Sequence, residues 1–126
     1  MRQTLLVGLA GLLGTLARYW LAGRVAARYG DAFPWGTLAV NVAGCFVAGV
    51  LFHLTSERAL FGEPWRTAVM VGLLGGFTTF SAYGLQTFGL LREGQVALAA
   101  ANVAASNVLG LLVVWAGYAL ARALNN

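Results

Sequence analysis

The stretch Gly75-Gly76-Phe77-Thr78-Thr79-Phe80-Ser81 decides how this sequence folds. It lies inside a long apolar segment, yet it joins two glycines, which weaken a helix, to hydroxyl side chains at positions 78, 79 and 81. We expect the helix to break here, which would free backbone carbonyls suited to a small hard cation. The alternative is a glycine kink that packs against a neighbouring helix, with the hydroxyls bonded back to their own helix.

The composition of the chain indicates that a lipid bilayer surrounds this stretch. Of the 126 residues, 60% are hydrophobic and 10% are charged, against roughly 45–50% and about 25% in soluble domains. Four acids and eight arginines cannot cover the surface of a water-soluble fold of this length. The chain has no lysine, which excludes a Walker A phosphate loop and a Schiff-base enzyme. Its single Cys and single His exclude a disulfide framework or a zinc cluster within one chain.

Four apolar segments approach the roughly 20 residues that a bilayer core requires. Every acid falls between these segments, and Trp20, Trp35 and Trp65 stand at segment ends, as is typical of a membrane interface. The sequence therefore predicts a single all-α membrane domain over residues 1–126, with four transmembrane helices of which the third is broken mid-membrane. The four segments cover residues 4–22, 35–55, 67–91 and 95–121.

The arginines are divided evenly between the two membrane faces that four crossings define. One face holds Arg2, Arg58, Arg66 and Arg122, and the other holds Arg18, Arg24, Arg28 and Arg92. The positive-inside rule therefore gives almost no preferred orientation, which favours insertion in both orientations unless a partner or one arginine decides the matter. A bundle of four helices leaves little room for a central aqueous pore, so transport would use an interface between copies, and we expect at least a homodimer.

Polar side chains inside the spans are the candidates for a functional path. The amide of Asn41 lies in the middle of the second span and must face protein or water, because an unpaired amide in hydrocarbon costs about 4–8 kcal/mol. Asn102 and Ser106 stand four apart and share a helical face, where they either extend a polar track with Thr79 and Ser81 or only bond helices together. Asn107 lies on a different face, and we expect it only to join helices.

A cationic and an aromatic feature accompany these amides and hydroxyls. Arg18 closes the first span, where its guanidinium forms either a vestibule that attracts anions or a simple interfacial anchor. Phe80 and Tyr83 are three apart, so both rings lie on one side of the third span. The positive edge of an aromatic ring can contact a desolvated anion, although packing is the alternative role for this pair.

Over nearly its whole length the chain resembles the Fluc or CrcB family of fluoride channels. Each matching segment falls in the correct span and in the correct order. The matching segments are GLLGTLARY at 11–19, GTLAVNVAG at 36–44, GGFTTFS at 75–81, and Ser106 with Gly110.

The resemblance implies an antiparallel dual-topology homodimer that conducts fluoride passively through two pores and so lowers its cytoplasmic concentration and toxicity. It also implies a structural sodium ion, not transported, held by the backbone carbonyls of Gly75 and Thr78 of each subunit. Arg18 matches the vestibule arginine of the family. The residues that match the fluoride pathway are Asn41, Phe80, Tyr83 and Ser106.

The chain departs from the family pattern at three positions. Tyr83 stands where the family usually has Phe, which adds a phenol hydroxyl to the ring pair. Gln86 occupies a place where many members carry Glu, and Asn102 one where several carry Tyr. We expect Tyr83 to alter conduction rate or ion dehydration while selectivity survives.

Two other kinds of protein share some of these features. A small proton-coupled multidrug exporter has four spans and often dual topology, but it needs a membrane-embedded carboxylate, and no span here contains one. A non-transporting subunit of a four-helix assembly would need only the glycine-rich packing. We expect no enzymatic activity, no nucleic-acid partner, and a location in the plasma membrane of a prokaryote, which is the inner membrane in a Gram-negative cell.

Overall fold

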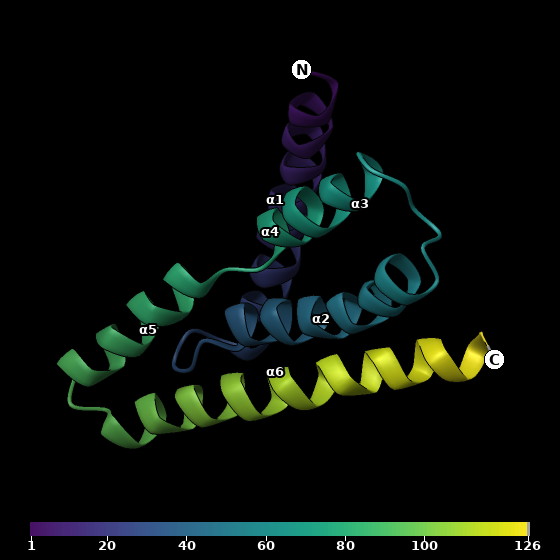
Figure 1. Cartoon of the computed structure of the whole chain (residues 1–126). Helices are drawn as coiled ribbons and strands as arrows, with labels where there is room; N and C mark the ends of the chain where they lie inside the picture. The colour runs from purple at the N-terminus through teal and green to yellow at the C-terminus, as the bar shows by residue number, and fades with distance from the viewer. Residues whose placement is uncertain (126) are drawn as a thin grey trace.

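The computed structural model describes residues 1–125, and within them every regular element is helical. Four helical runs are long and apolar enough to cross a membrane: Arg2–Tyr29, Trp35–Glu57, Trp65–Arg92 and Val96–Leu124. The predicted segments lie inside these runs, apart from Gln95, which precedes the last one. The elements are α1 (Arg2–Tyr29), α2 (Trp35–Phe52), η1 (His53–Glu57), α3 (Trp65–Thr67), η2 (Ala68–Leu73), α4 (Leu74–Phe77), α5 (Phe80–Arg92) and α6 (Val96–Leu124) (Figure 1).

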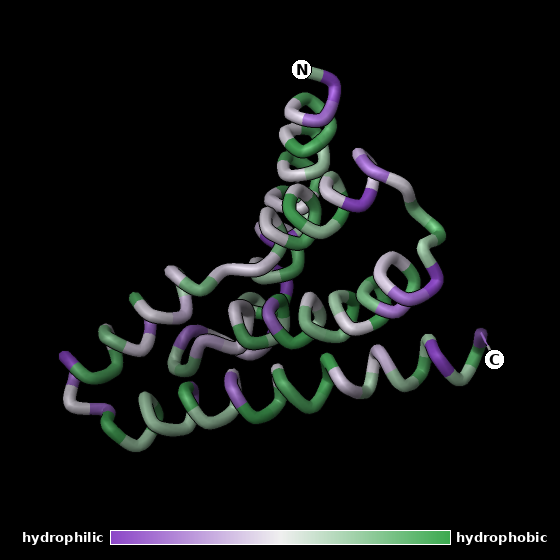
Figure 2. The backbone as a smooth tube through the Cα atoms, viewed as in Figure 1, coloured by the Kyte–Doolittle hydropathy of each residue, from purple (hydrophilic) through white to green (hydrophobic). Residues whose placement is uncertain are grey.

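The apolar residues of these runs face outward as well as inward. Figure 2 shows hydrophobic residues along most of each run and hydrophilic residues mainly in the connections and at the helix ends. Among the described residues, the largest side chains that are fully buried belong to Val40 and Asn102, neither of which is a large hydrophobic residue. Most leucines of α1 and α6 are exposed. A surface this apolar is stable only in a nonpolar surrounding, which is the expected property of a protein embedded in lipid.

Glycines bring the helices into direct backbone contact. A side chain on Gly14 of α1 would collide with the Leu73 carbonyl of η2, and one on Gly76 of α4 would collide with the Gly11 carbonyl of α1. Along the contact between α2 and α6, Gly117 lies in the same way against the Phe46 carbonyl. Such close approach replaces the hydrophobic driving force that helices lack in lipid.

The third run is interrupted by two residues with extended backbone. Helix α4 ends at Phe77, and α5 begins at Phe80. Between them, Thr78 has φ −85° and ψ 157°, and Thr79 has φ −149° and ψ 114°. The chain therefore crosses from α4 to α5 through a short strand-like link, which is visible in Figure 1 as a stretch without coils.

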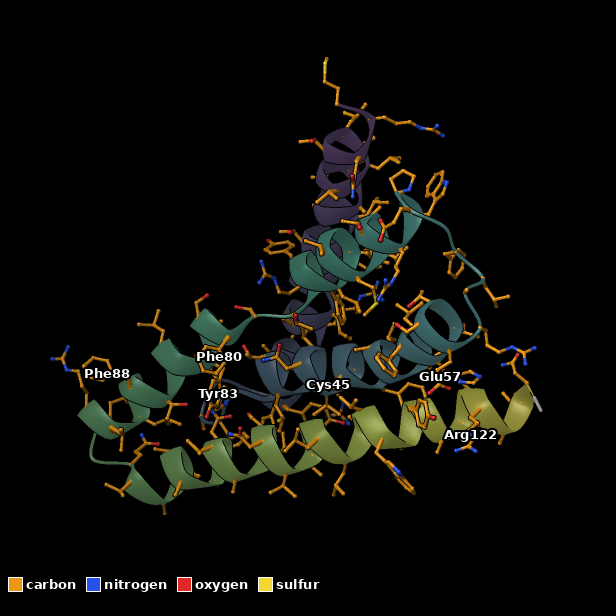
Figure 3. All side chains as sticks on the ribbon, in the orientation of Figure 1. Cys45, Glu57, Phe80, Tyr83, Phe88 and Arg122 are labelled. Carbon is orange, nitrogen blue, oxygen red and sulfur yellow. The ribbon has the colours of Figure 1, made fainter. Side chains whose placement is uncertain are left out.

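A carboxylate ties the end of the second run to the last helix. Glu57 of η1 accepts a hydrogen bond from His53 Nδ1 at 2.7 Å and another from the Tyr118 hydroxyl of α6 at 2.9 Å. Figure 3 places Glu57 and Arg122 at this end of the molecule, far from Phe80 and Tyr83. Within residues 1–125, the contact between His53 and Glu57 is the only one between a basic and an acidic side chain at ion-pair distance, and it is an ion pair only when His53 is protonated.

Candidate functional site

Asn41 holds the extended link of the third run from the neighbouring helix α2. Its Nδ2 donates to the Thr79 carbonyl at 2.9 Å, and its Oδ1 accepts from the Thr79 N–H at 2.8 Å. One amide side chain therefore satisfies both backbone groups of a residue that has left the helix. An unpaired backbone group in an apolar surrounding raises the free energy of the folded state. This pairing removes that cost and so allows the helix to be interrupted inside the bundle.

The hydroxyl groups of Thr78 and Thr79 form hydrogen bonds with the helices on either side of the link. The Thr79 hydroxyl accepts from the Ala82 N–H at 3.2 Å and so caps the N-terminus of α5. The Thr78 hydroxyl donates back to the Leu74 carbonyl at 2.9 Å, which is the bond to its own helix expected for a kink. Gly44, one helical turn after Asn41, leaves room for the Thr78 methyl group against α2.

The link leaves backbone carbonyls without the partners that a continuous helix provides. In such a helix the Gly75 carbonyl would accept from the Thr79 N–H, but this N–H donates to Asn41. A side chain at Gly75 would meet no atom within 4 Å, so this position borders open space. The Thr78 carbonyl accepts only a long bond of 3.4 Å from Arg18 Nη1 of α1.

These two carbonyls are chemically suited to a hard cation. Carbonyl oxygens are ligands that such ions prefer, and no group of three His, Cys, Asp or Glu side chains occurs within residues 1–125 to compete for the role. Two oxygens are too few for a complete coordination shell, so a second copy of the chain or water would have to supply the others. The positive charge of the Arg18 guanidinium, which lies beside the Thr78 carbonyl, disfavours the binding of a cation at that carbonyl.

Most of the predicted site residues border one cavity of about 480 Å³. The Phe80 and Tyr83 rings meet at its edge with centroids 5.4 Å apart and planes tilted by 45°. Phe80 is 83% exposed in the single chain, and Figure 3 shows it beside Tyr83, with Phe88 further along α5. The predicted residues that line the cavity are Asn41, Gly75, Thr78, Thr79, Phe80, Tyr83 and Ser106.

The remaining predicted residues near the link line a second cavity of about 450 Å³. Arg18 and Ser81 border it, and Thr79 borders both cavities. The link therefore lies between two hollows, one with the aromatic pair and one with the guanidinium. Thr37 of α2 lines the second cavity and was not singled out from the sequence. Its place one helical turn before Asn41 was the available signal.

Two asparagines of α6, Asn102 and Asn107, join this helix to α5. Asn102 lines neither of these two cavities, is 2% exposed and donates to the Thr87 hydroxyl of α5 at 2.9 Å. Asn107 does join helices, since it donates to the Tyr83 hydroxyl at 3.4 Å, but it also lines the first cavity beside Ser106. The helix-joining role expected for Asn107 is therefore present, and its place in the cavity lining is a second contact that the sequence did not indicate.

The fold and the site together define a class of protein. Four membrane-spanning helices surround an uncharged polar link, and the four acids of the chain lie outside the predicted spans. Such a site offers amide, hydroxyl and carbonyl groups with an arginine nearby, but no carboxylate that could exchange protons. These are the properties of a multi-pass membrane protein whose candidate site consists of uncharged polar groups and one nearby arginine.

Comparison with known proteins identifies the family. The family described as "CrcB-like protein, Camphor Resistance (CrcB)" matches residues 5–118. A protein of Opitutus terrae named fluoride-specific ion channel FluC is 49% identical over 97% of this chain and 94% of its own length. Proteins of the same name from Methylocella silvestris and Geobacter sulfurreducens are 48% and 45% identical, over 90% and 98% of this chain and 88% and 100% of their own lengths. The chain belongs to the CrcB family.

Replacement of Asn41 by Ala is expected to destabilise the folded chain. The N–H and carbonyl of Thr79 would both lose their partner, at a cost of about 1–3 kcal/mol. The measurement is the free energy of unfolding in detergent, followed by circular dichroism. Asn107→Ala is the matched control, because its bond to Tyr83 is long and exposed, and a loss of stability as large as that of Asn41→Ala would contradict the special role of Asn41.

Proposed function

We propose that this chain is a fluoride-selective passive ion channel that exports fluoride and so lowers its concentration and toxicity in the cytoplasm. Its relatives at 45–49% identity carry the name of a fluoride-specific channel. The observation that carries the proposal is the pairing of Asn41 with the extended link at Thr79, because it builds an uncharged polar site between two cavities within a membrane span.

The first cavity contains groups that could replace the water around a small anion. Asn41 Nδ2 carries two hydrogens, and only one is used in the bond to Thr79. The Ser106 hydroxyl makes only a long bond of 3.4 Å to Asn102, so it can turn toward an ion. The edges of the Phe80 and Tyr83 rings carry partial positive charge and would contact the anion from the open side.

The guanidinium of Arg18 would serve as the vestibule of this path. It borders the second cavity and points at the Thr78 carbonyl. A fixed positive charge in a recess with walls of low dielectric constant raises the local concentration of anions. Thr79 and Ser81 line the same recess and offer hydroxyl groups along the way. Asn102 contributes to the path only by holding Ser106 and Thr87.

The channel is proposed to be an antiparallel homodimer of two oppositely inserted copies. The even division of the arginines between the two faces agrees with insertion in both orientations. The exposure of Phe80 and the open space at Gly75 leave the first cavity unfinished in a single chain. A second copy would close it, and the third run would then be broken within the membrane where the two copies cross.

A structural sodium ion at that crossing is part of the proposal. The carbonyls of Gly75 and Thr78 from each copy would give four oxygen ligands, and the ion would hold the two links together without being transported. The whole chain would act as one domain in the plasma membrane of a prokaryote, the inner membrane in a Gram-negative cell.

The channel can be tested against the alternative of a non-transporting assembly subunit by flux. Purified protein is reconstituted into liposomes loaded with fluoride or with chloride, and release is followed with ion-selective electrodes. We expect rapid release of fluoride and retention of chloride. If liposomes that contain correctly folded dimer release neither ion, the alternative of a non-transporting assembly subunit is supported. Release of both ions would show that the channel is not selective for fluoride.

Replacement of Phe80 by Leu is expected to slow fluoride release by roughly two- to tenfold. The loss of a ring-edge contact of about 0.5–1.5 kcal/mol at the transition state produces a change of this order. The matched control is Phe88→Leu, on the same helix but outside both cavities, which should change the rate less than twofold on the same scale. Equal rates for wild type and both variants would leave packing as the role of Phe80.

Replacement of sodium by N-methylglucamine on both sides of the liposome is expected to abolish fluoride release. This organic cation is too bulky to fit between carbonyls that suit a small ion. Return of sodium to the same liposomes should restore release, which controls for damage to the protein. Undiminished flux without sodium would exclude a required ion at Gly75 and Thr78.

A further inference from the structure

An exposed row of side chains along α1 changes in polarity in a regular order from one end of the row to the other. These residues form what we call the α1 stripe. They recur every four positions, so neighbouring members lie about 6 Å apart on one ridge, and this ridge turns gradually around the helix because four residues exceed one helical turn. The apolar and aromatic members are well exposed: Leu12 by 56%, Leu16 by 55% and Trp20 by 64%. The stripe consists of Leu12, Leu16, Trp20, Arg24 and Arg28, and both arginines are exposed.

The cationic end of the α1 stripe is held in place but not neutralised. The Arg24 guanidinium carbon lies 3.9 Å from the centre of the Trp20 ring, and that of Arg28 lies 5.6 Å from the Tyr29 ring. Within residues 1–125 no carboxylate lies at ion-pair distance from either guanidinium, since the single contact of that kind is between His53 and Glu57. Cation–π contact fixes the direction of a guanidinium while its N–H donors stay free.

We propose that the α1 stripe binds an anionic phospholipid. The acyl chain would lie along Leu12 and Leu16, the glycerol region beside Trp20, and the phosphate between Arg24 and Arg28. The order of apolar, aromatic and cationic groups along α1 repeats the order of polarity along a lipid molecule at a membrane interface. Gly23 and Ala27 lie beside the two arginines on the exposed surface and leave room for a headgroup.

The charges of the chain favour a lipid over a second copy of the protein as the occupant. Two unpaired guanidiniums would need carboxylates on a protein partner, and the four acids of this chain are confined to the connections and to the end of the second helical run. An anionic phospholipid brings a phosphate, which a guanidinium binds through two parallel N–H bonds. This lipid site contains none of the residues of the proposed ion path. The proposal of lipid binding therefore does not depend on whether the chain conducts fluoride.

Native mass spectrometry of the full-length chain tests the site. The protein is released from micelles that contain equal amounts of phosphatidylglycerol and phosphatidylcholine, and the lipids retained are counted. We expect wild type to retain phosphatidylglycerol at least about fivefold over phosphatidylcholine, and the pair of substitutions Arg24→Gln and Arg28→Gln to lower this retention about tenfold. The matched control, Arg2→Gln with Arg58→Gln, removes the same charge elsewhere and should leave retention unchanged.

A second readout locates the lipid without altering the arginines. In a chain with Trp35, Trp65 and Trp115 replaced by Phe, the fluorescence of Trp20 should be quenched more by brominated phosphatidylglycerol than by brominated phosphatidylcholine. Inorganic phosphate should not relieve this quenching at the same concentration, which separates a lipid site from a simple anion site. Equal quenching by the two lipids, equal retention of both by wild type, or an equal loss in both double variants would overturn the proposal.

Discussion

The pairing of the Asn41 amide with both backbone groups of Thr79 is the interaction on which the rest of the structure depends. A membrane span cannot leave its helix unless something replaces the lost hydrogen bonds, because lipid supplies none. Asn41 supplies both, and this one replacement has several results. The Gly75 carbonyl loses its helical partner, Thr79 becomes free to cap α5, and two cavities form on either side of the link. The polar character of the site therefore follows from how one interruption is accommodated.

Much of this arrangement could be predicted because lipid imposes strong rules on sequence. The four spans follow from the length of apolar segments, and the glycines and hydroxyls at 75–81 indicate where the third one weakens. The partner of the link could not be derived, since the need to satisfy the Asn41 amide does not say which backbone group satisfies it. The bond from Arg18 to Thr78 and the place of Asn107 at the first cavity depend on how α1 and α6 cross the third run, which spacing along one helix does not determine.

Close glycine contacts explain how so small a chain holds an interruption rigidly. Gly14 and Gly76 let the backbones of α1 and α4 touch just before the link begins, and Gly44 of α2 makes room for the side-chain methyl group of Thr78. A larger residue at any of these points would push a helix outward and lengthen the bonds at Thr79. The helices supply rigidity through van der Waals contact, while Asn41 supplies the polar match. Neither contribution would suffice alone, because packing cannot satisfy a peptide group and one amide cannot position three helices.

The position of Thr79 between the two cavities has a consequence for the electrical behaviour of the membrane around this protein. In a channel whose two hollows connect to opposite aqueous phases, water in them would carry the potential of each phase deep into the bundle. Most of the transmembrane voltage would then fall across the short link and not across the full length of the helices. An ion near the link would then feel a steep local field over a distance of a few ångströms. The current would depend on voltage mainly through that one short step.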